Sequence, residues 1–300
     1  MIVSEEATQA LTLLVAIPCL NEEQTVARVV EAIPREIPGI ASVQVLVIDD
    51  GSTDATAAKA LEAGAEVHSH PRTLGLGVSF RNAAEIAISR GVDIFVNIDG
   101  DGQFDPTDLP TLVLPIIAGQ AHMVTASRFM DPKLTPKMPA IKRWGNRRVA
   151  GIVALLTGQR FHDVSCGFRA LSRETLLRLN LFGSFTYTQE CFMDCVFKNL
   201  TILEVPVAVR GVREFGTSRV AASIPRYAVR SLQIMLRAFI SYRPFTLFTA
   251  LAAISLVAGL GFLGFLGLHY WATGKFSPHI WSGFVGGSFT FFGLGTLVVG

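Results

Sequence analysis

Two carboxylates and an amide follow one another at alternate positions, Asp99, Asp101 and Gln103, directly after the apolar run Ile94–Ile98. In an extended backbone alternate side chains project to the same side, so these three can offer oxygen atoms to one cation. Mg²⁺ and Mn²⁺ suit such ligands, and Mg²⁺ normally completes its shell with water and substrate phosphates. The spacing therefore predicts a divalent metal site whose ligand is a nucleotide diphosphate.

Two further polar clusters follow apolar runs in the same manner. Leu11–Ile17 leads into Pro18–Glu23, and Val43–Ile48 leads into Asp49–Asp54. Each cluster alone is also typical of a turn, and Asp54 suits the N-cap of the alanine-rich segment after it. Since ligands of parallel sheets bind beyond the carboxyl ends of the strands, the clusters together predict one site.

The pattern that must position these clusters alternates between short apolar runs and helical periodicity. We expect strands at Leu11–Ile17, Val43–Ile48, Ala65–His68, Ile94–Ile98 and His122–Ala126. We expect helices at Glu22–Ala32, Asp54–Ala63, Val78–Ser89 and Thr107–Ala118. This βαβα order predicts an α/β fold with a mostly parallel, Rossmann-like sheet covered on both faces.

The end of the chain has almost no charge. Of 50 charged residues, 49 lie in residues 1–243, and only Lys275 follows. Apolar segments of about 20 residues match the thickness of a bilayer, so we expect two transmembrane helices, at about 245–271 and 280–300. Because the apolar run still continues at Gly300, we also expect further residues after it in the natural protein.

The distribution of basic residues predicts how the protein sits in a membrane. Seven arginines and one acid occur between Arg210 and Arg243, whereas the segment between the two spans carries one lysine. By the positive-inside rule the first 243 residues face the cytoplasm, which makes the protein an integral protein of the cytoplasmic (inner) membrane. The acidic Ser4–Glu6 does not resemble a signal peptide, and four cysteines without C-x-x-C spacing indicate free thiols in a reducing compartment.

Two basic segments have the character of membrane-surface helices. Lys133–Arg148 contains six basic residues, no acid and Trp144. Residues 221–243 are expected to form an amphipathic helix that carries Arg226, Arg230 and Arg237 on one face. Such helices favour anionic lipid, so we expect membrane lipid as a partner, and no nucleic acid because apolar spans follow directly.

Five motifs occur in an order that resembles the inverting family-2 glycosyltransferases, and within them the dolichyl- or polyprenyl-phosphate sugar synthases. The motifs are Val15–Glu23, Val47–Asp54, Asn97–Gln103, Ala126–Arg128 and Asp163–Arg169. The resemblance implies a GT-A catalytic domain at 1–220, an amphipathic juxtamembrane helix at 221–243 and a transmembrane hairpin at 244–300. It also implies transfer of one sugar from a nucleotide-diphosphate sugar to a polyprenyl phosphate, with inversion and with Mg²⁺ or Mn²⁺.

The same resemblance implies a role for each matching residue. The nucleotide-sugar would be bound by Pro18, Leu20, Glu22, Asp50, Asp99, Gly100, Asp101, Arg128, Arg213 and Arg219. The metal would be bound by Asp101, Gln103 and Asp99, and the acceptor phosphate by Arg128 and Arg143. The catalytic residues would be Asp99, Asp101 and Arg213.

Several alternatives remain open at this point. The acceptor is either a polyprenyl phosphate or another lipid or polysaccharide, although Ala140 stands where processive synthases carry the glutamine of Gln-x-x-Arg-Trp. Glu190 either positions the sugar or belongs to a helix that faces the core. From another class of protein, an inactive scaffold or lipid-binding subunit would have the same membrane pattern. A homo-oligomer is compatible with the sequence.

Overall fold

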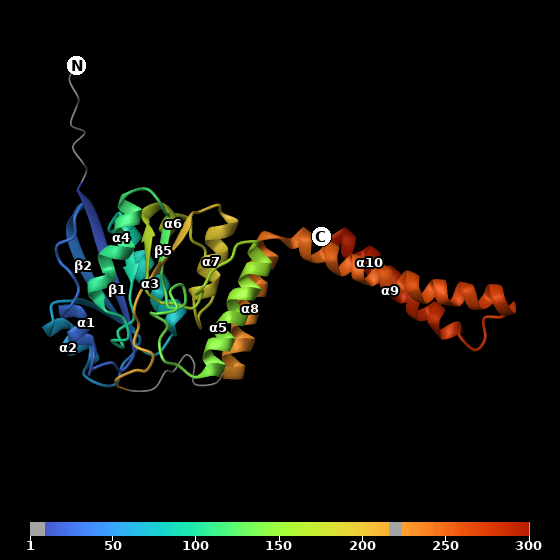
Figure 1. Ribbon diagram of the computed structural model, residues 1–300, viewed down its shortest axis with the longest axis horizontal. Coiled ribbons are helices and arrows are strands. Elements are labelled where there is room, and N and C mark those ends of the chain that lie inside the picture. The colour runs from blue at the N-terminus through green and yellow to red at the C-terminus, as the bar shows by residue number, and fades with distance from the viewer. Residues whose placement is uncertain (1–9, 216–223, 300) are drawn as a thin grey trace, which may run out of the picture. The chain divides into compact units, whose positions relative to one another are not determined.

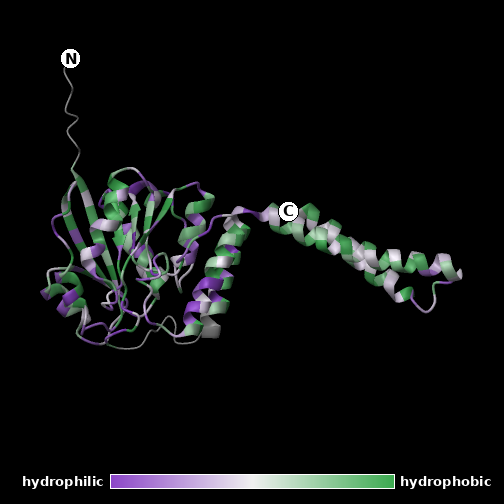
Figure 2. Cartoon of the chain, in the orientation of Figure 1, coloured by the Kyte–Doolittle hydropathy of each residue, from purple (hydrophilic) through white to green (hydrophobic). Residues whose placement is uncertain are grey.

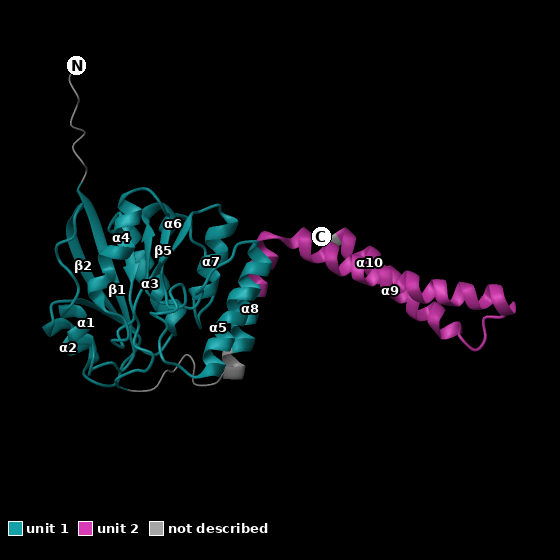
Figure 3. Ribbon diagram, viewed as in Figure 1, with its two compact units in different colours: residues 1–235 teal, residues 236–300 magenta. Residues whose placement is uncertain are grey.

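The computed structural model describes residues 10–215 and 224–299. The chain divides into two compact units, residues 1–235 and residues 236–300, which Figure 3 shows in different colours. The first contains the sheet, and the second consists of helices.

The first unit is built on one seven-stranded sheet with the order β3-β2-β1-β4-β6-β5-β7 (Figure 1). Its strands are β1 (Leu11–Cys19), β2 (Ile40–Asp49), β3 (Glu66–Ser69), β4 (Ile94–Asn97), β5 (Met123–Ser127), β6 (Arg169–Ser172) and β7 (Ile202–Pro206). All neighbouring pairs are parallel except β4–β6 and β5–β6, which are antiparallel. The expected mostly parallel α/β sheet is therefore confirmed, and β6 and β7 are additions that the apolar pattern did not reveal.

Helices and a short 3₁₀ turn connect the strands. They are α1 (Val26–Glu31), α2 (Thr56–Glu62), α3 (Leu76–Ser89), η1 (Pro106–Asp108), α4 (Leu109–Ile117), α5 (Ala140–Thr157), α6 (Arg173–Arg178) and α7 (Thr188–Phe197). The helix expected from Glu22 begins only at Val26, because residues 22–25 form a turn in which the Glu22 carbonyl accepts the amides of Thr25 and Val26. Asp54 accepts the Thr56 amide at the start of α2, but the N-cap of this helix is Ala55, so Asp54 lies one residue before the expected capping position.

The core follows from the alternation of side chains along buried strands. Leu13, Val15 and Ile17 of β1 pack in one apolar cluster with residues of α1 and α4. On the opposite face of the sheet lies α3, whose Phe80 contacts Phe95 of β4 edge to face. Helices thus pack on both faces of the sheet.

The chain continues through α8 (Ile224–Tyr242) into α9 (Pro244–Thr273) and α10 (Ile280–Val299). Figure 2 shows that α9 and α10 consist largely of hydrophobic and neutral residues, whereas hydrophilic residues recur along α8. Both α9 and α10 are long and apolar enough to cross a membrane. They agree with the expected spans at 245–271 and 280–300, apart from a longer first helix.

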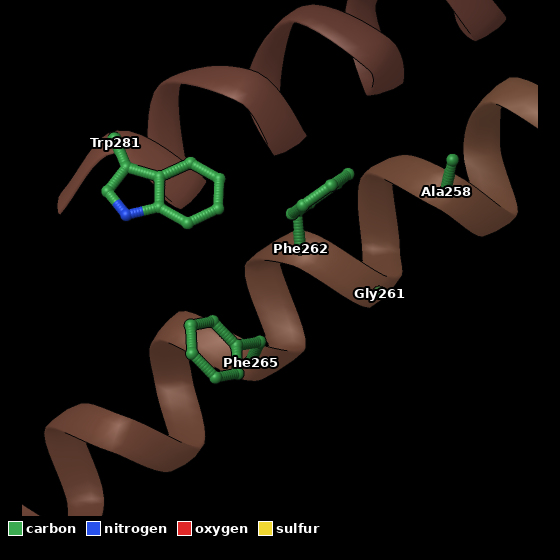
Figure 4. A pocket seen from close by; sticks show the side chains of 5 residues that line it. All are labelled: Ala258, Gly261, Phe262, Phe265 and Trp281. Carbon is green, nitrogen blue, oxygen red and sulfur yellow. The ribbon is translucent and has the colours of Figure 1, made fainter. Parts of the chain in front are cut away.

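Glycines bring α9 and α10 into close contact. A Cβ atom at Gly259 would lie 2.4 Å from Thr290 Oγ1, and one at Gly286 would lie 2.8 Å from the Gly259 carbonyl oxygen. Gly283 and Gly287 have the small-xxx-small spacing of packed membrane helices, but a Cβ atom at Gly287 would meet nothing within 4 Å. In the same part of α9, Ala258, Gly261, Phe262 and Phe265 line an apolar depression of about 410 Å³ together with Trp281 of α10 (Figure 4). The hairpin is therefore packed through backbone contact, as in lipid-embedded helix pairs.

Candidate active site

The three polar clusters meet at one edge of the sheet. β1 lies between β2 and β4, and Cys19 is in register with Asp49. The Asp50 amide donates to the Cys19 carbonyl, and the Thr25 hydroxyl donates to the Gly100 carbonyl at 2.7 Å. The ends of β1, β2 and β4 are thereby tied together, and their side chains form one site. Pro18 and Leu20 lie half-buried at the end of β1.

Asp99 and Asp101 are the acidic centre of this site. A Cβ atom at Gly167 would lie 2.7 Å from both carboxylate oxygens of Asp99, so the carboxylate packs directly on that backbone. A Cβ atom at Gly100 would similarly lie 2.4 Å from Cys19 Sγ. Burial, and after it the neighbouring Asp101 carboxylate, raise the pKa of Asp99 from 3.8 to about 7. Two neighbouring carboxylates that are poorly solvated favour a cation between them.

Arg213 supplies a cation at the same place. Its Nη1 donates to Glu22 Oε1 at 2.9 Å, and its Nε lies 2.8 Å from Asp101 Oδ2. The second contact is an ion pair without hydrogen-bond geometry, because the buried Nε–H finds no hydrogen-bond acceptor among the described residues. The guanidinium therefore joins the ends of β1 and β4.

The residues present fit a divalent metal ion. Asp99 and Asp101 are hard oxygen donors, and together they contribute two negative charges to a half-closed site. Within residues 10–215 and 224–299 there is no group of three or more His, Cys, Asp or Glu side chains that could hold a metal. Mg²⁺ is commonly coordinated by one or two carboxylates together with water and phosphate oxygens, which agrees with these two side chains. Gln103 is near them, but its side-chain amide donates to the Arg210 carbonyl at 2.7 Å.

The Asp99→Asn substitution is expected to stabilise the metal-free protein at neutral and alkaline pH. The folded chain holds the Asp99 proton between pH 3.8 and about 7, so the free energy of unfolding falls as pH rises through this window. We expect the Asp99→Asn variant to melt about 4 °C above the wild type near pH 8 and equally with it near pH 3. Thermal unfolding in detergent with a chelator measures this. A gain of the same size at both pH values would contradict the ionisation argument.

Asp50 lies at the end of β2 and is held by internal partners. Its Oδ1 accepts the Leu74 amide and contacts His70 Nδ1, both at 2.8 Å, and its Oδ2 accepts the Gly75 amide at 2.9 Å. His70 in turn contacts Asn82 through Nε2. The expected nucleoside-binding carboxylate therefore also fixes the start of α3, so it would present its remaining lone pair from a rigid position.

The Gly75-x-Gly77 segment owes its glycines to protein packing. The Gly77 amide donates to the Ser184 carbonyl, and a Cβ atom at Gly77 would lie 2.2 Å from the Gly183 carbonyl oxygen. Glu190 of α7 is buried and accepts the amides of Phe182 and Gly183, each at 3.0 Å. Of the two readings of Glu190, the geometry favours the structural one: its carboxylate holds the loop that packs on α3.

Replacing Gly167 with alanine is expected to lower the turnover rate about thirtyfold, because a displacement of a reacting group by about 1 Å costs rates of this order. The added methyl group would occupy the place of the Asp99 carboxylate. Gly145→Ala is the matched control, since a Cβ atom there meets nothing within 4 Å. Steady-state kinetics of both variants measure the difference, and an unaltered rate for Gly167→Ala would show that Asp99 need not keep this position.

Arg128 follows β5 and is clamped by Asp163. Its Nε and Nη2 donate to the two carboxylate oxygens of Asp163 at 2.6 and 2.8 Å. Burial of Asp163 would raise its pKa, but the Arg128 charge and hydrogen bonds outweigh this and lower it. The Arg128 charge also acts to lower the pKa of Asp99, and its guanidinium lies 5.3 Å from the Phe129 ring centroid. Phe129, which Arg128 contacts, also belongs to the next feature.

That feature is a groove of about 830 Å³ along α5. It is lined by Phe129, Pro132, Thr135, Ala140, Arg143, Trp144, Arg147, Ala150, Gly151, Ala154, Arg160, Phe161 and His162. Arg143, Arg147 and Arg160 are exposed, and none of them takes part in an ion pair within the part of the chain that the structure describes. The groove thus combines uncompensated positive charge with apolar and aromatic walls.

The structure adds residues that the sequence did not single out. Arg169 is fully buried, and its guanidinium donates to the carbonyls of Cys166 and Thr188. Asn97 donates to the Gly167 carbonyl and to the Tyr187 hydroxyl, which fixes the backbone under Asp99. Both residues lie within the sequence motifs named above, so the motifs could have pointed to them. Their hydrogen-bond partners are distant in the sequence and could not be predicted from it. Arg219 lies outside the described residues.

Comparisons with known proteins agree with this geometry. The profile of the family "Glycosyl transferase family 2" matches residues 14–179. The chain is 34% identical over 190 residues to Glycosyltransferase AglJ of Haloferax volcanii, and the match spans 63% of this chain and 60% of that protein. It is 28% identical over 226 residues to polyprenol monophosphomannose synthase of Mycolicibacterium smegmatis, which covers 72% of this chain and 83% of that one.

Solved structures show the same fold. Glucosyl-3-phosphoglycerate synthase from Mycobacterium tuberculosis, in complex with Mn²⁺, uridine-diphosphate-glucose and phosphoglyceric acid, superposes with a TM-score of 0.56 at 25% sequence identity. The superposition covers 77% of this chain and 79% of that one. The sheet of the first unit is therefore of the GT-A type, as the motif series implied.

Proposed function

Because the chain belongs to glycosyl transferase family 2 and is a glycosyltransferase, we propose that it moves one sugar from a nucleotide-diphosphate sugar to a polyprenyl phosphate. The reaction takes place at the cytoplasmic membrane face, inverts the anomeric centre and requires Mg²⁺ or Mn²⁺. The product serves as a lipid-linked sugar donor for cell-envelope glycan or glycolipid assembly. The observation that carries the proposal is the arginine-lined groove whose wall includes Phe129, the aromatic ring that Arg128 contacts.

The donor side of the proposal rests on the ends of β1, β2 and β4. Glu22 and Asp50 accept hydrogen bonds from the nucleoside, with Pro18 and Leu20 beneath it and Gly100 allowing close approach. Arg213 binds the diphosphate through its guanidinium, and Arg219 assists. Arginine suits this task because its planar fork matches phosphate oxygens.

Asp99 and Asp101, with Gln103 at the rim, would hold the metal ion. When bound there, a divalent cation neutralises charge on the departing diphosphate. The chain itself supplies positioning: Gly167 seats the Asp99 carboxylate, and Arg213 compensates Asp101. Catalysis then rests on orientation and charge stabilisation, with Asp99, Asp101 and Arg213 as catalytic residues.

The acceptor side rests on the groove. A phosphate oxygen of the acceptor, already ionised near neutral pH, attacks the anomeric carbon, and the bond from that carbon to the diphosphate oxygen breaks. No proton has to be removed, so the site needs no strong general base. Arg128 and Arg143 bind the acceptor phosphate, while Trp144 and Phe161 contact the first isoprene units. The relative from M. smegmatis bears the name of a polyprenol phosphate enzyme, which supports this class of acceptor.

The membrane arrangement complements this acceptor. α9 and α10 anchor the chain in the bilayer, and α8 lies at its surface as an amphipathic juxtamembrane helix. The arginines before α9 keep the catalytic unit in the cytoplasm. A lipid acceptor thus stays in the membrane while its phosphate reaches the groove.

A donor screen tests the proposal. Purified full-length protein in detergent is incubated with undecaprenyl phosphate, Mn²⁺ or Mg²⁺ and a panel of nucleotide sugars, and glycolipids are resolved by mass spectrometry. We expect one sugar to be added from one donor, and none without metal or when undecaprenol replaces its phosphate. Repeated addition would indicate a polysaccharide synthase, and absence of product from every donor would contradict the proposal in favour of a scaffold.

A further inference from the structure

One side chain of the groove is a histidine with an ordered partner. His162 precedes Asp163, lines the groove and is exposed. Its Nδ1 lies 3.0 Å from Glu204 Oε2. This contact fixes the ring plane and directs Nδ1–H at Glu204, so Nε2 is the ring nitrogen that faces a ligand, and it donates to an anion in the doubly protonated imidazolium form. A histidine oriented in this manner is prepared to bind an anion in the groove.

Glu204 of β7 is the group that orients it. The Glu204 side chain is 8% exposed, and its carboxylate accepts the His162 amide at 2.8 Å and the Asp163 amide at 2.8 Å besides contacting the ring. Asp163 is the residue that clamps Arg128. One buried carboxylate therefore aligns both His162 and the ion pair that holds Arg128.

The charges around His162 favour an anionic ligand. Facing the groove with it are Arg143 and Arg147 of α5 and Arg160, none of which has an ion-pair partner in the described parts of the chain. The acids packed near the ring are Glu204 and Asp163, and both are already engaged by donors of the protein. An added phosphate would thus meet donors without meeting an unpaired carboxylate among these residues.

We infer that His162 binds the acceptor phosphate in the α5 groove through Nε2, and that Glu204 is the positioning residue for this contact. The inference rests on the proposed function, because it assigns the groove to the lipid phosphate of that reaction. It adds to Arg128 and Arg143 a donor that distinguishes a phosphate head from the hydroxyl of a free polyprenol.

Kinetics with undecaprenyl phosphate test the inference. His162→Ala is expected to raise the KM for this acceptor about tenfold, since a hydrogen bond to a charged group contributes about that much to affinity. The kcat and the KM for the nucleotide sugar should stay unchanged. His162→Gln should recover part of the loss because its amide can still donate, and Glu204→Gln should raise the same KM. The matched control is His122→Ala, a histidine that pairs with Glu174 outside the groove.

Binding separates this inference from the proposed function. Trp144 lines the groove and becomes the sole tryptophan of the full chain when Trp271 and Trp281 are replaced by phenylalanine. Titration with undecaprenyl phosphate should change its fluorescence, with undecaprenol and inorganic phosphate as comparisons. We expect His162→Ala to weaken this binding about tenfold.

Each outcome decides between the two proposals. If the wild type makes glycolipid and His162→Ala keeps the KM for undecaprenyl phosphate, the inference is overturned and the function stands. If no donor gives product but Trp144 reports binding that His162→Ala weakens, the function fails and the phosphate site stands. If undecaprenyl phosphate does not bind the wild type, or binds both proteins equally, the role of His162 is overturned. A circular dichroism spectrum and melting temperature close to wild type confirm that each variant is folded.

Discussion

Replacing Asp101 with asparagine is expected to lower sugar transfer about a thousandfold, or about 4 kcal/mol of transition-state stabilisation. The change removes one of the two carboxylate charges that would hold the metal, and it removes the ion pair with Arg213 Nε. The fold should persist, because an asparagine oxygen can still accept the Gln103 amide and because the repulsion between Asp99 and residue 101 disappears. The measurement is glycolipid formation at saturating donor and acceptor.

The control for this variant is Asp108→Asn, which makes the same chemical change in η1, away from the metal-binding pair. It should retain wild-type turnover. Metal affinity gives an independent readout, because Mn²⁺ binding followed by electron paramagnetic resonance should be lost in Asp101→Asn and kept in Asp108→Asn. Normal turnover of Asp101→Asn would remove the acidic centre from the reaction.

Replacing Arg213 with alanine is expected to lower kcat/KM for the nucleotide sugar about a hundredfold, which is typical for loss of one donor to a developing anion. Arg213 is the side chain that joins Glu22 to Asp101 across the site. The loss also leaves Asp99 and Asp101 without the nearest compensating charge. The free energy of unfolding should change much less than the activity.

Two matched variants sharpen this result. Arg210→Ala removes an exposed arginine whose ion pair is with Glu214, so it should leave donor kinetics close to wild type. Arg213→Lys keeps the charge but loses the planar fork, so it should recover only part of the activity. Equal kinetics for Arg213→Ala and the wild type with both substrates would place Arg213 outside the site.

The sequence was sufficient to predict the α/β class, the two apolar helices and the meeting of three polar clusters, since each depends on local periodicity or on the absence of charge. Strands β1, β2 and β4 are largely buried and apolar, so their runs of apolar residues predict them directly from the sequence. β6 was missed because its four residues include Arg169, a charged side chain that only a set of distant carbonyls makes tolerable.

The net charge of +2 also illustrates what the sequence determines and what the tertiary structure decides. The sequence separates into two basic segments, Lys133–Arg148 and Arg210–Arg243, and an acidic remainder. This distribution of charge already indicated a metal-binding domain and two segments suited to phosphates. The tertiary structure decided which charges stay available. Arg128 is committed to Asp163, whereas Arg143, Arg147 and Arg160 have no ion pair in the described residues.

The chain's own order of residues therefore determined which chemistry is present: hard oxygen ligands after buried strands, arginines for phosphates and a membrane hairpin. Only the tertiary structure decided how these groups are held. Gly167 seats Asp99, Glu204 aligns His162 with the Asp163 clamp, and Glu190 accepts two amides of the loop that packs on α3. The physical reason is that such partners lie far apart in sequence, so their contacts depend on the sheet order and on packing that no local pattern encodes.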